Sequence, residues 1–366
     1  MKIYLDTIIF ARQRFGGISN VWYEYVSRML KDENVELNLF GLDNYINMRY
    51  MELNKENAKH LKDKKSNINI LRLISPDIKS TEKCIFQSTD LRICKKKNVK
   101  NIVMIHDTTH QIYFKGIKKI INTYQKRKAI KNADGIVYIS DNTRKDTNRF
   151  FKKSTEKMEK VIYNSASEDF CKLDKPELPE RYKEVENKKY FIYVGDRTNY
   201  KNVDFLYRVL RENPHINAVI VGGKDFSEKE LEELVDIKDR IYKYSKVPND
   251  ELNILYNKAF CSIYPSLYEG FGIPVLEAMK TGCPVIAFNN SSIPEVLKGT
   301  GILLENNDIE GCNEQIKKLE DFAYRKKIEN EEIEKSKFFD WNKSYKELMD
   351  FYEEVLNNGD KYEKKL

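Results

Sequence analysis

Two glutamates with seven residues between them, Glu269 and Glu277, flank a Gly-Phe-Gly-Ile-Pro turn. Proline favours the first position of a helix and glycine follows its end, so the segment predicts a helix from Pro274 to about Thr281 that stops at Gly282. The first N–H groups of such a helix and the positive end of its dipole form an anion site. The two carboxylates would lie at opposite ends of that site, where each could accept hydrogen bonds from hydroxyl groups on one side of a diphosphate.

The glycines of this turn, Gly270 and Gly272, would let the backbone come close to a ligand. Each glutamate could instead merely cap or solvate a short helix, and for either glutamate alone we favour that interpretation. For the whole segment we favour a ligand site, because the glycines, the proline and both carboxylates all fit the binding of a diphosphate with hydroxyl groups on either side.

A pair of cations, Arg197 and Lys201, follows an expected strand in the segment YVGDRTNYKN. Arginine offers paired donors to a phosphate and lysine a point charge, so both could stabilise the charge of a departing nucleoside diphosphate. A solvated loop is the alternative.

Arg197, Lys201 and the helix start could supply the electrostatic stabilisation that a metal would otherwise give. The sequence also contains no D-x-D motif and no His/Cys/Glu cluster with metal spacing. We therefore predict that no metal or other cofactor is required.

The first half of the chain offers weaker signals. Gly16 and Gly17 lie in a turn after the first expected strand, where a phosphate or sugar could approach the backbone. His106 ends the segment NIVMIH, at the edge where parallel sheets bind ligands. A histidine held by hydrogen bonds at the edge of the core would explain the same pattern equally well.

Short apolar runs alternate with amphipathic stretches, which favours parallel sheets with helices on both faces. We predict an α/β fold with two doubly wound, Rossmann-like domains that face an interdomain cleft, because such sheets bind ligands beyond the carboxyl ends of their strands. The expected strands are 2–6, 35–42, 101–107, 134–140, 160–164, 190–195, 217–223, 260–266, 284–288 and 301–305.

The domain boundaries follow from a charged, proline-containing segment at 171–189, which we predict to be a linker. It would join an N-terminal, acceptor-side domain at 1–170 to a C-terminal, donor-binding domain at 190–345. Residues 346–366 are expected to form a C-terminal helix that packs back on the N-terminal domain.

Composition excludes several classes of protein. A formal net charge of +7 is too small for a protein that coats nucleic acid, and we expect no nucleic-acid partner. The six cysteines form no C-x-x-C pair, so buried free thiols in a reducing compartment are expected. The N-terminus becomes charged too early for a signal peptide, and no apolar run reaches the ~20 residues of a membrane span. These features predict a cytoplasmic protein.

The segment 115–131, KGIKKIINTYQKRKAIK, carries seven basic residues and no acidic one, with isoleucines and a tyrosine between them. Such a helix can lie on an anionic membrane surface, which would place the protein peripherally on the inner face of the plasma membrane. The alternative, which we favour from the sequence, is a solvated helix whose apolar face packs on the sheet.

The segment YPSLYEGFGIPVLEAMKTGCPVI resembles the E-x7-E region of the retaining glycosyltransferases of family 4, which have the two-domain GT-B fold. The resemblance implies that Glu269 contacts the transferred sugar and that Glu277 contacts the ribose of the nucleotide. It also implies contacts of the intervening backbone with the nucleotide-sugar donor, at Phe271, Gly272, Ile273, Val275 and Leu276.

Other segments resemble the same family in chain order. YVGDRTNYKN is similar to its G-x-R-x(n)-K-N segment, which implies that Arg197 and Lys201 hold the diphosphate. By the same resemblance, the loop with Gly16 and Gly17 closes over the diphosphate, and His106 lies beside the sugar carbon that is attacked.

The implied activity is retaining transfer of a sugar from a nucleotide diphosphate sugar, of GDP-mannose or UDP-N-acetylhexosamine type, to a glycan hydroxyl. GGISNVWYEYV resembles bacterial enzymes that build O-antigen, capsule or related surface polysaccharides, often on a polyprenyl-diphosphate carrier, so we expect a lipid-linked acceptor. Two alternatives stay open: a nucleotide-sugar epimerase of the same architecture, and a non-catalytic nucleotide-binding scaffold.

Overall fold

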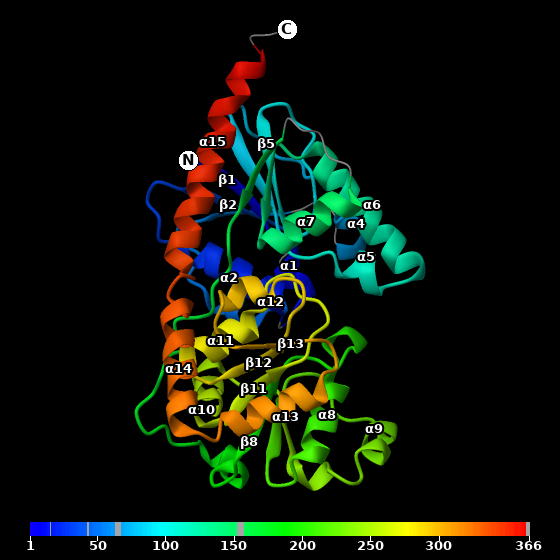
Figure 1. Cartoon of the computed structure of the whole chain (residues 1–366). Coiled ribbons are helices and arrows are strands. Elements are labelled where there is room, and N and C mark those ends of the chain that lie inside the picture. Colours follow the sequence, from blue (N-terminus) through cyan, green and yellow to red (C-terminus); the bar gives the residue numbers. More distant parts are fainter. Residues whose placement is uncertain (15, 42–43, 63–66, 152–156, 364–366) are drawn as a thin grey trace. The chain divides into compact units, whose positions relative to one another are not determined.

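The computed structural model describes residues 1–366 except 15, 42–43, 63–66, 152–156 and 364–366 (Figure 1). The chain forms two compact units, each with its own sheet. Unit 1 comprises Met1–Asn164 and Trp341–Leu366, and unit 2 comprises Ser165–Asp340. The predicted α/β class with two doubly wound domains is confirmed, whereas the cleft between the domains stays a prediction.

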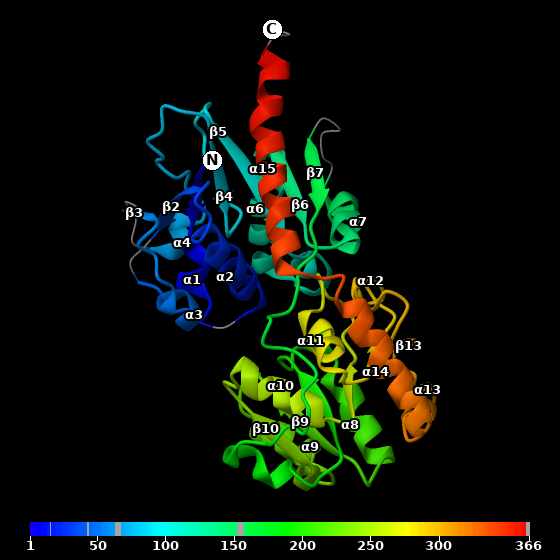
Figure 2. The same cartoon turned by 90° about the vertical axis from the view of Figure 1, so that its left-hand side faces the viewer.

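Unit 1 contains a seven-stranded parallel sheet in the order β3-β2-β1-β4-β5-β6-β7. Helices cover both faces of the sheet, so its inner strands are buried (Figures 1 and 2). The strands are β1 (Lys2–Asp6), β2 (Glu36–Gly41), β3 (Lys59–Lys62), β4 (Cys84–Ser88), β5 (Val99–Ile105), β6 (Gly135–Tyr138) and β7 (Met158–Val161). The helices are α1 (Ile8–Arg12), α2 (Gly17–Met29), α3 (Met48–Glu52), α4 (Ile68–Leu71), α5 (Thr109–Tyr113), α6 (Gly116–Asn132), α7 (Asp141–Phe150) and α15 (Trp341–Glu363).

Unit 2 contains a six-stranded parallel sheet in the order β10-β9-β8-β11-β12-β13. The strands are β8 (Tyr190–Val194), β9 (Asn217–Val221), β10 (Ile241–Tyr244), β11 (Cys261–Tyr264), β12 (Val285–Phe288) and β13 (Ile302–Leu304). The α-helices are α8 (Val203–Glu212), α9 (Glu228–Glu233), α10 (Asn249–Lys258), α11 (Ile273–Thr281), α12 (Ile293–Leu297), α13 (Ile309–Lys318) and α14 (Phe322–Ser336).

Three strands lie outside the segments that the sequence predicts. β4 is fully buried between β1 and β5, but its sequence CIFQS shows neither a continuous apolar run nor a clear alternation. β3 and β10 are edge strands, with the sequences KHLK and IYKY, so they need little apolar surface. These strands are defined by their parallel pairing with neighbouring strands, and the local sequence pattern does not show which strands will pair.

The segment 171–189, predicted as a linker, belongs to unit 2, which already begins at Ser165. Within it, Glu180–Val185 forms a 3-10 helix that buries Tyr182. The hydroxyl of Tyr182 donates a hydrogen bond to Glu251 Oε2 at 2.6 Å. Charge and proline content therefore marked an irregular segment, but tertiary packing makes it part of the domain.

The C-terminal helix α15 packs on unit 1, against α2, β4 and β5. It begins at Trp341 rather than at residue 346. The ring of Trp341 packs edge-on against Tyr25, with ring centroids 5.5 Å apart. Farther along the helix, the hydroxyl of Tyr352 donates to Gln87 Oε1 at 2.8 Å. The boundary therefore follows from packing on unit 1.

The strand order reverses at one point in each sheet, between β1 and β4 in unit 1 and between β8 and β11 in unit 2. The loops that leave the carboxyl ends of two such strands diverge to opposite sides and leave a crevice, where ligands of doubly wound sheets bind. In unit 2, the loop after β8 carries Arg197 and Lys201, and the loop after β11 carries Glu269.

Five of the six cysteines are buried, and all six are unpaired. The expectation of buried free thiols is wrong for Cys171, which is exposed. Within the described residues, no helix combines the length and apolar character needed to cross a bilayer. The cytoplasmic location stays a prediction.

Candidate functional site

Helix α11 starts at Ile273, one position before the predicted start, and ends at Thr281 as predicted. Gly272 precedes it with φ = 101°, a left-handed conformation that glycine adopts without strain. A Cβ atom at this position would lie 2.7 Å from Ile293 Cδ1, so the turn excludes a larger residue. The amides of Val275 and Leu276 donate to Gly272 O at 3.0 and 3.4 Å, so both already have an acceptor within the helix.

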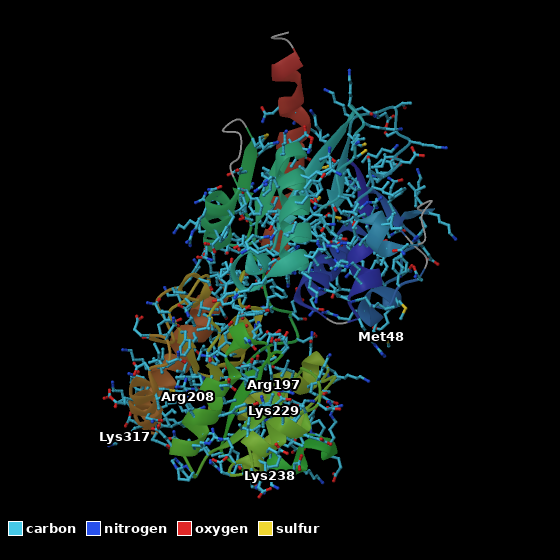
Figure 3. All side chains as sticks on the ribbon, turned by 90° about the vertical axis from the view of Figure 1, so that its right-hand side faces the viewer. Met48, Arg197, Arg208, Lys229, Lys238 and Lys317 are labelled. Atoms are coloured by element: carbon cyan, nitrogen blue, oxygen red, sulfur yellow. The ribbon has the colours of Figure 1, made fainter. Side chains whose placement is uncertain are left out.

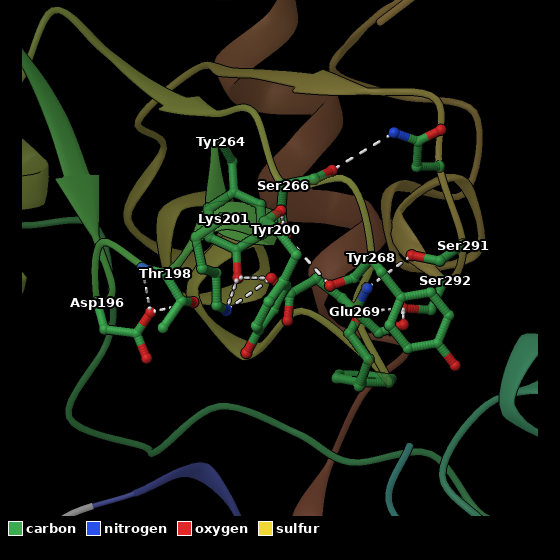
Figure 4. Close-up of polar contacts among 12 residues, drawn as sticks. Asp196, Thr198, Tyr200, Lys201, Tyr264, Ser266, Tyr268, Glu269, Ser291 and Ser292 are labelled. Atoms are coloured by element: carbon green, nitrogen blue, oxygen red, sulfur yellow. Dashed lines mark hydrogen bonds and ion pairs between the residues drawn. The ribbon is translucent and has the colours of Figure 1, made fainter. Parts of the chain in front are cut away.

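The loop after β11 brings the carboxylate of Glu269 to the ammonium group of Lys201 (Figure 4). Lys201 Nζ lies 2.6 Å from Glu269 Oε1, and the same oxygen accepts a hydrogen bond from the hydroxyl of Tyr264 at 2.8 Å. The Lys201 and Glu269 side chains are only 15% and 12% exposed. Burial alone would lower the pKa of Lys201, but the charge and hydrogen bond of Glu269, together with Tyr200 and Asp196, outweigh burial and raise that pKa. The cation is therefore held charged at the switch point of the sheet.

The backbone of Glu269 is fixed by two serines that precede α12. Glu269 N donates to Ser291 Oγ at 2.8 Å (Figure 4). Ser292 Oγ donates to the carbonyls of Glu269 and Phe271 at 3.0 and 2.8 Å. These serines and Tyr264 were not among the predicted site residues, because a local pattern does not show which residues a loop will meet.

Glu277 lies on α11, and its carboxylate accepts a hydrogen bond from the hydroxyl of Tyr256 at 3.3 Å. Burial raises the pKa of Glu277 to about 7, while the hydrogen bond from Tyr256 and the charge of Lys280 lower it. The carboxyl group is therefore partly protonated near neutral pH, and a ligand that donates hydrogen bonds to it would favour its ionised form.

Arg197 has other hydrogen-bond partners than the Lys201–Glu269 pair, in the loop after β9 and in α9. Its Nε donates to Glu230 Oε1 at 2.8 Å, and its terminal nitrogens donate to the carbonyls of Lys224 and Asp225 at 2.8 and 3.1 Å. The hydrogen bond from Arg197 to Glu230, with those from the backbone and side chain of Ser227, lowers the pKa of Glu230 to about 2. The sequence does not predict this partner, since Glu230 lies 33 residues away along the chain.

His106 lies just beyond the end of β5 in unit 1, with its ring edge-on to Trp22 at 6.3 Å between centroids. Burial lowers the pKa of His106 to about 4, although the charge of Asp107 raises it, so the imidazole is neutral at pH 7. Its buried Nε2 atom has no hydrogen-bond partner in the described part of the chain. Because buried polar atoms are rarely left unpaired, this nitrogen could accept a hydrogen bond from a ligand hydroxyl once a local movement uncovers it.

The segment beside His106 is held by Lys126 of α6, which is 4% exposed. Lys126 Nζ donates to the carbonyl of Asp107 at 2.6 Å and to Gln111 Oε1 at 3.1 Å. The sequence grouped Lys126 with the surface cations of 115–131, and that assignment is wrong. A lysine among exposed lysines gives no local signal of burial; only the packing of α6 on the loop after β5 reveals it.

Gly16 and Gly17 lie at the start of α2 in unit 1. The backbone at Gly16 is extended, and a Cβ atom there would lie 2.6 Å from Gln13 Oε1. A Cβ atom at Gly17 would meet nothing within 4 Å, so the fold does not require a glycine at that position. The open space beside Gly17 could admit a ligand, but nothing in the geometry of Gly17 indicates which ligand.

Thus the structure joins Lys201 to Glu269 in unit 2 and places Glu277 on the helix that follows. It pairs Arg197 with Glu230 instead. His106, Gly16 and Gly17 belong to unit 1. Over the described residues, no group of three or more His, Cys, Asp or Glu side chains could hold a metal ion.

Most of unit 2 is similar in sequence to a known protein family. Residues 174–337 match the family described as Glycosyl transferases group 1. The O-antigen chain mannosyltransferase RfbU of Salmonella typhimurium is 30% identical over 209 residues, which are 56% of this chain and 56% of that protein. The O-antigen chain mannosyltransferase B of Escherichia coli is 30% identical over 172 residues, which are 44% of this chain and 45% of that protein. The chain spans about half the length of these curated relatives.

Solved structures show the same fold at low identity. Sucrose-phosphate synthase from Thermosynechococcus elongatus matches with a TM-score of 0.76 and 15% identity, covering 97% of this chain and 99% of that one. WaaG, a glycosyltransferase involved in lipopolysaccharide biosynthesis, matches with a TM-score of 0.68 and 14% identity, covering 96% and 99%. The chain therefore has the two-domain GT-B architecture, and its residues 174–337 match the Glycosyl transferases group 1 family.

Proposed function

We propose that this protein is a retaining glycosyltransferase that moves a sugar from a nucleotide diphosphate sugar to a hydroxyl group of a glycan. The observation that carries the proposal is the Lys201–Glu269 pair at the switch point of unit 2, inside the segment that matches the glycosyl transferase family. A buried cation held beside a carboxylate at the start of a helix suits a ligand with a diphosphate next to a sugar.

The residues take distinct roles in the proposed reaction. The acceptor oxygen forms a bond to the anomeric carbon of the sugar while the bond from that carbon to the diphosphate breaks. The acceptor proton passes to the leaving phosphate oxygen on the same face, so no separate protein base is needed. Lys201 and the start of α11 stabilise the leaving diphosphate, Glu269 and neutral His106 orient the sugar, and Glu277 binds the ribose.

Arg197 can take part in phosphate binding only by exchanging its present partners. Its hydrogen bonds to Glu230 and to two carbonyl groups would be replaced by bonds to phosphate oxygens. Arg197 and Ser227 both donate hydrogen bonds to the Glu230 carboxylate, so this carboxylate has several partners in this structure. We therefore propose that Lys201 and the start of α11 bind the diphosphate. Arg197 would join them only after its present hydrogen bonds are replaced by bonds to phosphate oxygens.

For the donor we propose GDP-mannose, because the relatives reported above are named O-antigen mannosyltransferases; a UDP-N-acetylhexosamine is the second candidate. For the acceptor we propose a surface-polysaccharide precursor on a polyprenyl-diphosphate carrier. The epimerase alternative is not favoured, since its function would require an acid and a base on either side of the sugar, and the described residues that we assign to the sugar are only neutral His106 and the ion-paired Glu269.

The proposal predicts that nucleotide binding needs no metal. Thermal unfolding would be measured with UDP, GDP, ADP and their sugars in the presence of EDTA, and one nucleotide should raise Tm with the concentration dependence of mass action. The same donor should then transfer its sugar to a polyprenyl-diphosphate-linked glycan. If no nucleotide raises Tm with or without Mg²⁺, the donor site is wrong; if donors interconvert without an acceptor, the protein is an epimerase.

A second prediction concerns Lys126, which we infer positions the segment with His106. Replacing it by methionine keeps the length of the side chain but removes both hydrogen bonds. Burying the charge of Lys126 destabilises the fold, whereas its two hydrogen bonds stabilise it. Removing the charge and the hydrogen bonds together should therefore change Tm little. Transfer should slow by about tenfold or more in kcat, with KM for the donor nearly unchanged, because the sugar is bound mainly through unit 2.

The control for Lys126→Met is Lys145→Met, at an exposed position of α7 in the same unit. Kinetics and Tm of both variants would be measured side by side. A lower Tm together with an unchanged kcat for Lys126→Met would show that the lysine only stabilises the fold.

A further inference from the structure

One face of unit 1 exposes a continuous group of apolar side chains interleaved with cations, and we call it the apolar–basic surface. It is formed by α4 and the residues after it, by α5 and by α6, which are grouped on one side of unit 1 (Figure 1). Its apolar members are Ile70, Leu73, Ile74, Ile112, Tyr113, Ile117, Ile120, Ile121 and Tyr124. Its basic members are Lys115, Lys118, Lys119, Arg127, Lys128 and Lys131.

Helix α6 carries the centre of this surface. Ile117, Ile120 and Tyr124 are 73%, 67% and 61% exposed. Only the second half of the helix packs inward, through Ala129 and Ile130, against the core beneath β5 and β6. The interpretation that the apolar face of 115–131 packs on the sheet is therefore wrong for the first half of the helix, whose isoleucines recur every three or four residues on an unpartnered face.

Hydrogen bonds join the three segments of the surface. Gln111 of α5 donates to Asn122 and Thr123 of α6 at 3.0 and 3.1 Å. On the other side, Lys128 Nζ donates to the carbonyl of Leu73 at 3.3 Å. The nine apolar side chains therefore lie on one assembled surface rather than on separate loops.

The charge of the surface has one sign. Neither 67–76 nor 109–133 contains an aspartate or a glutamate. Lys115, Lys118, Arg127 and Lys131 are exposed, and Lys119 and Lys128 are half-buried. The one lysine of α6 that is fully buried, Lys126, is used inside the fold and is not counted here.

We propose that the apolar–basic surface docks on an anionic lipid bilayer. Isoleucine and tyrosine side chains would enter the boundary between headgroups and acyl chains, while the lysines between them stay at the level of the anionic headgroups. Lysine is depleted at protein–protein interfaces, whereas alternation of lysine and isoleucine suits a membrane surface. Helices α5 and α6 follow the carboxyl end of β5, where His106 lies. Docking would therefore bring lipid-linked glycans to that edge of unit 1, a consequence that rests on the proposed function.

The test is sedimentation of the full chain with vesicles of phosphatidylcholine alone or mixed with phosphatidylglycerol. We expect binding to the anionic vesicles only, weakening as salt is raised. The apolar variant, Ile117→Ser with Ile120→Ser and Ile121→Ser, should bind at least about tenfold more weakly. The charge variant, Lys115→Gln with Lys118→Gln and Arg127→Gln, should lose binding by roughly tenfold or more.

Matched controls come from unit 2. Val235 and Phe322 are 64% and 78% exposed there, so Val235→Ser with Phe322→Ser removes apolar side chains of similar exposure. Lys229, Lys238 and Lys317 are exposed lysines of unit 2, and their replacement by glutamine is the control for charge (Figure 3). Both controls should bind anionic vesicles as the unchanged protein does.

Three outcomes would overturn the proposal: no sedimentation with anionic vesicles, equal binding to neutral vesicles, or equal losses in the variants and their controls. Retention on polyglutamate, lost in the apolar variant and without vesicle binding, would assign the surface to an acidic protein partner instead. Nucleotide binding by unit 2 is measured separately, so vesicle binding can fail while the proposed transferase activity holds, and the reverse.

Discussion

Replacing Glu269 by glutamine should lower the rate of sugar transfer by roughly a hundredfold or more. The substitution keeps the shape of the side chain but removes the charge that lies 2.6 Å from Lys201 Nζ. Lys201 would then be a nearly buried cation without its counter-charge, and its direction toward the leaving diphosphate would no longer be fixed. Rates would be measured with saturating donor and compared with the shift in Tm that the nucleotide produces.

Loss of fold is the main alternative explanation for a slow Glu269→Gln variant, because breaking a buried ion pair destabilises a protein by up to several kcal/mol. A double variant, Glu269→Gln with Lys201→Met, removes both charges and should recover much of Tm while transfer stays slow. Tyr264→Phe keeps the ion pair and removes one hydrogen bond to Glu269, so its stability cost should be only about 1 kcal/mol. Transfer by the double variant at the rate of the unchanged protein would show that the pair is structural.

Replacing Glu277 by glutamine should make the protein more stable and its nucleotide binding weaker. Burial raises the pKa of Glu277 from 4.5 to about 7. Below pH 4.5 the group is protonated in both the folded and the unfolded chain and costs nothing. As pH rises from 4.5 to 7, the unfolded chain loses this proton first, so the carboxyl group increasingly destabilises the fold, by at most roughly 3 kcal/mol above pH 7.

The glutamine variant should therefore have a higher Tm than the unchanged protein at pH 8 and nearly the same Tm near pH 4. Nucleotide affinity should fall in the unchanged protein by up to about tenfold between pH 7 and pH 6, since ribose hydroxyls need the ionised carboxylate. The phosphate also titrates in this range, so the two proteins are compared at each pH. A variant that binds as tightly as the unchanged protein at pH 8 would remove Glu277 from the donor site.

Glu314→Gln is the control for both glutamates, since Glu314 is an exposed residue in the interior of α13. It should change neither Tm at pH 8 nor the rate of transfer. A change of similar size in this control would mean that net charge, rather than either site carboxylate, produces the effects.

Much of the fold could be predicted because local patterns carry it. β1 was predicted with its observed bounds, and α11 within one residue, since an apolar run identifies a buried parallel strand and proline with glycine limits a helix. β4 could not be predicted, because its burial comes from neighbours that are distant in the sequence. For the same reason the sequence pattern of 171–189 predicts a linker, whereas its packing within unit 2 depends on partners such as Glu251.

For the candidate site, too, one part could be predicted from the sequence and another part could not. The sequence by itself determined which residue types surround the candidate anion site, because Glu269, Gly272 and Glu277 lie within one turn and one helix. Only the tertiary structure decided how they are paired: Lys201 with Glu269 across the switch point, Arg197 with Glu230, and Lys126 in the interior beside His106. Hydrogen bonds act over about 3 Å, whereas these partners are separated by tens of residues along the chain, so their pairing follows from strand order and helix packing rather than from any local pattern.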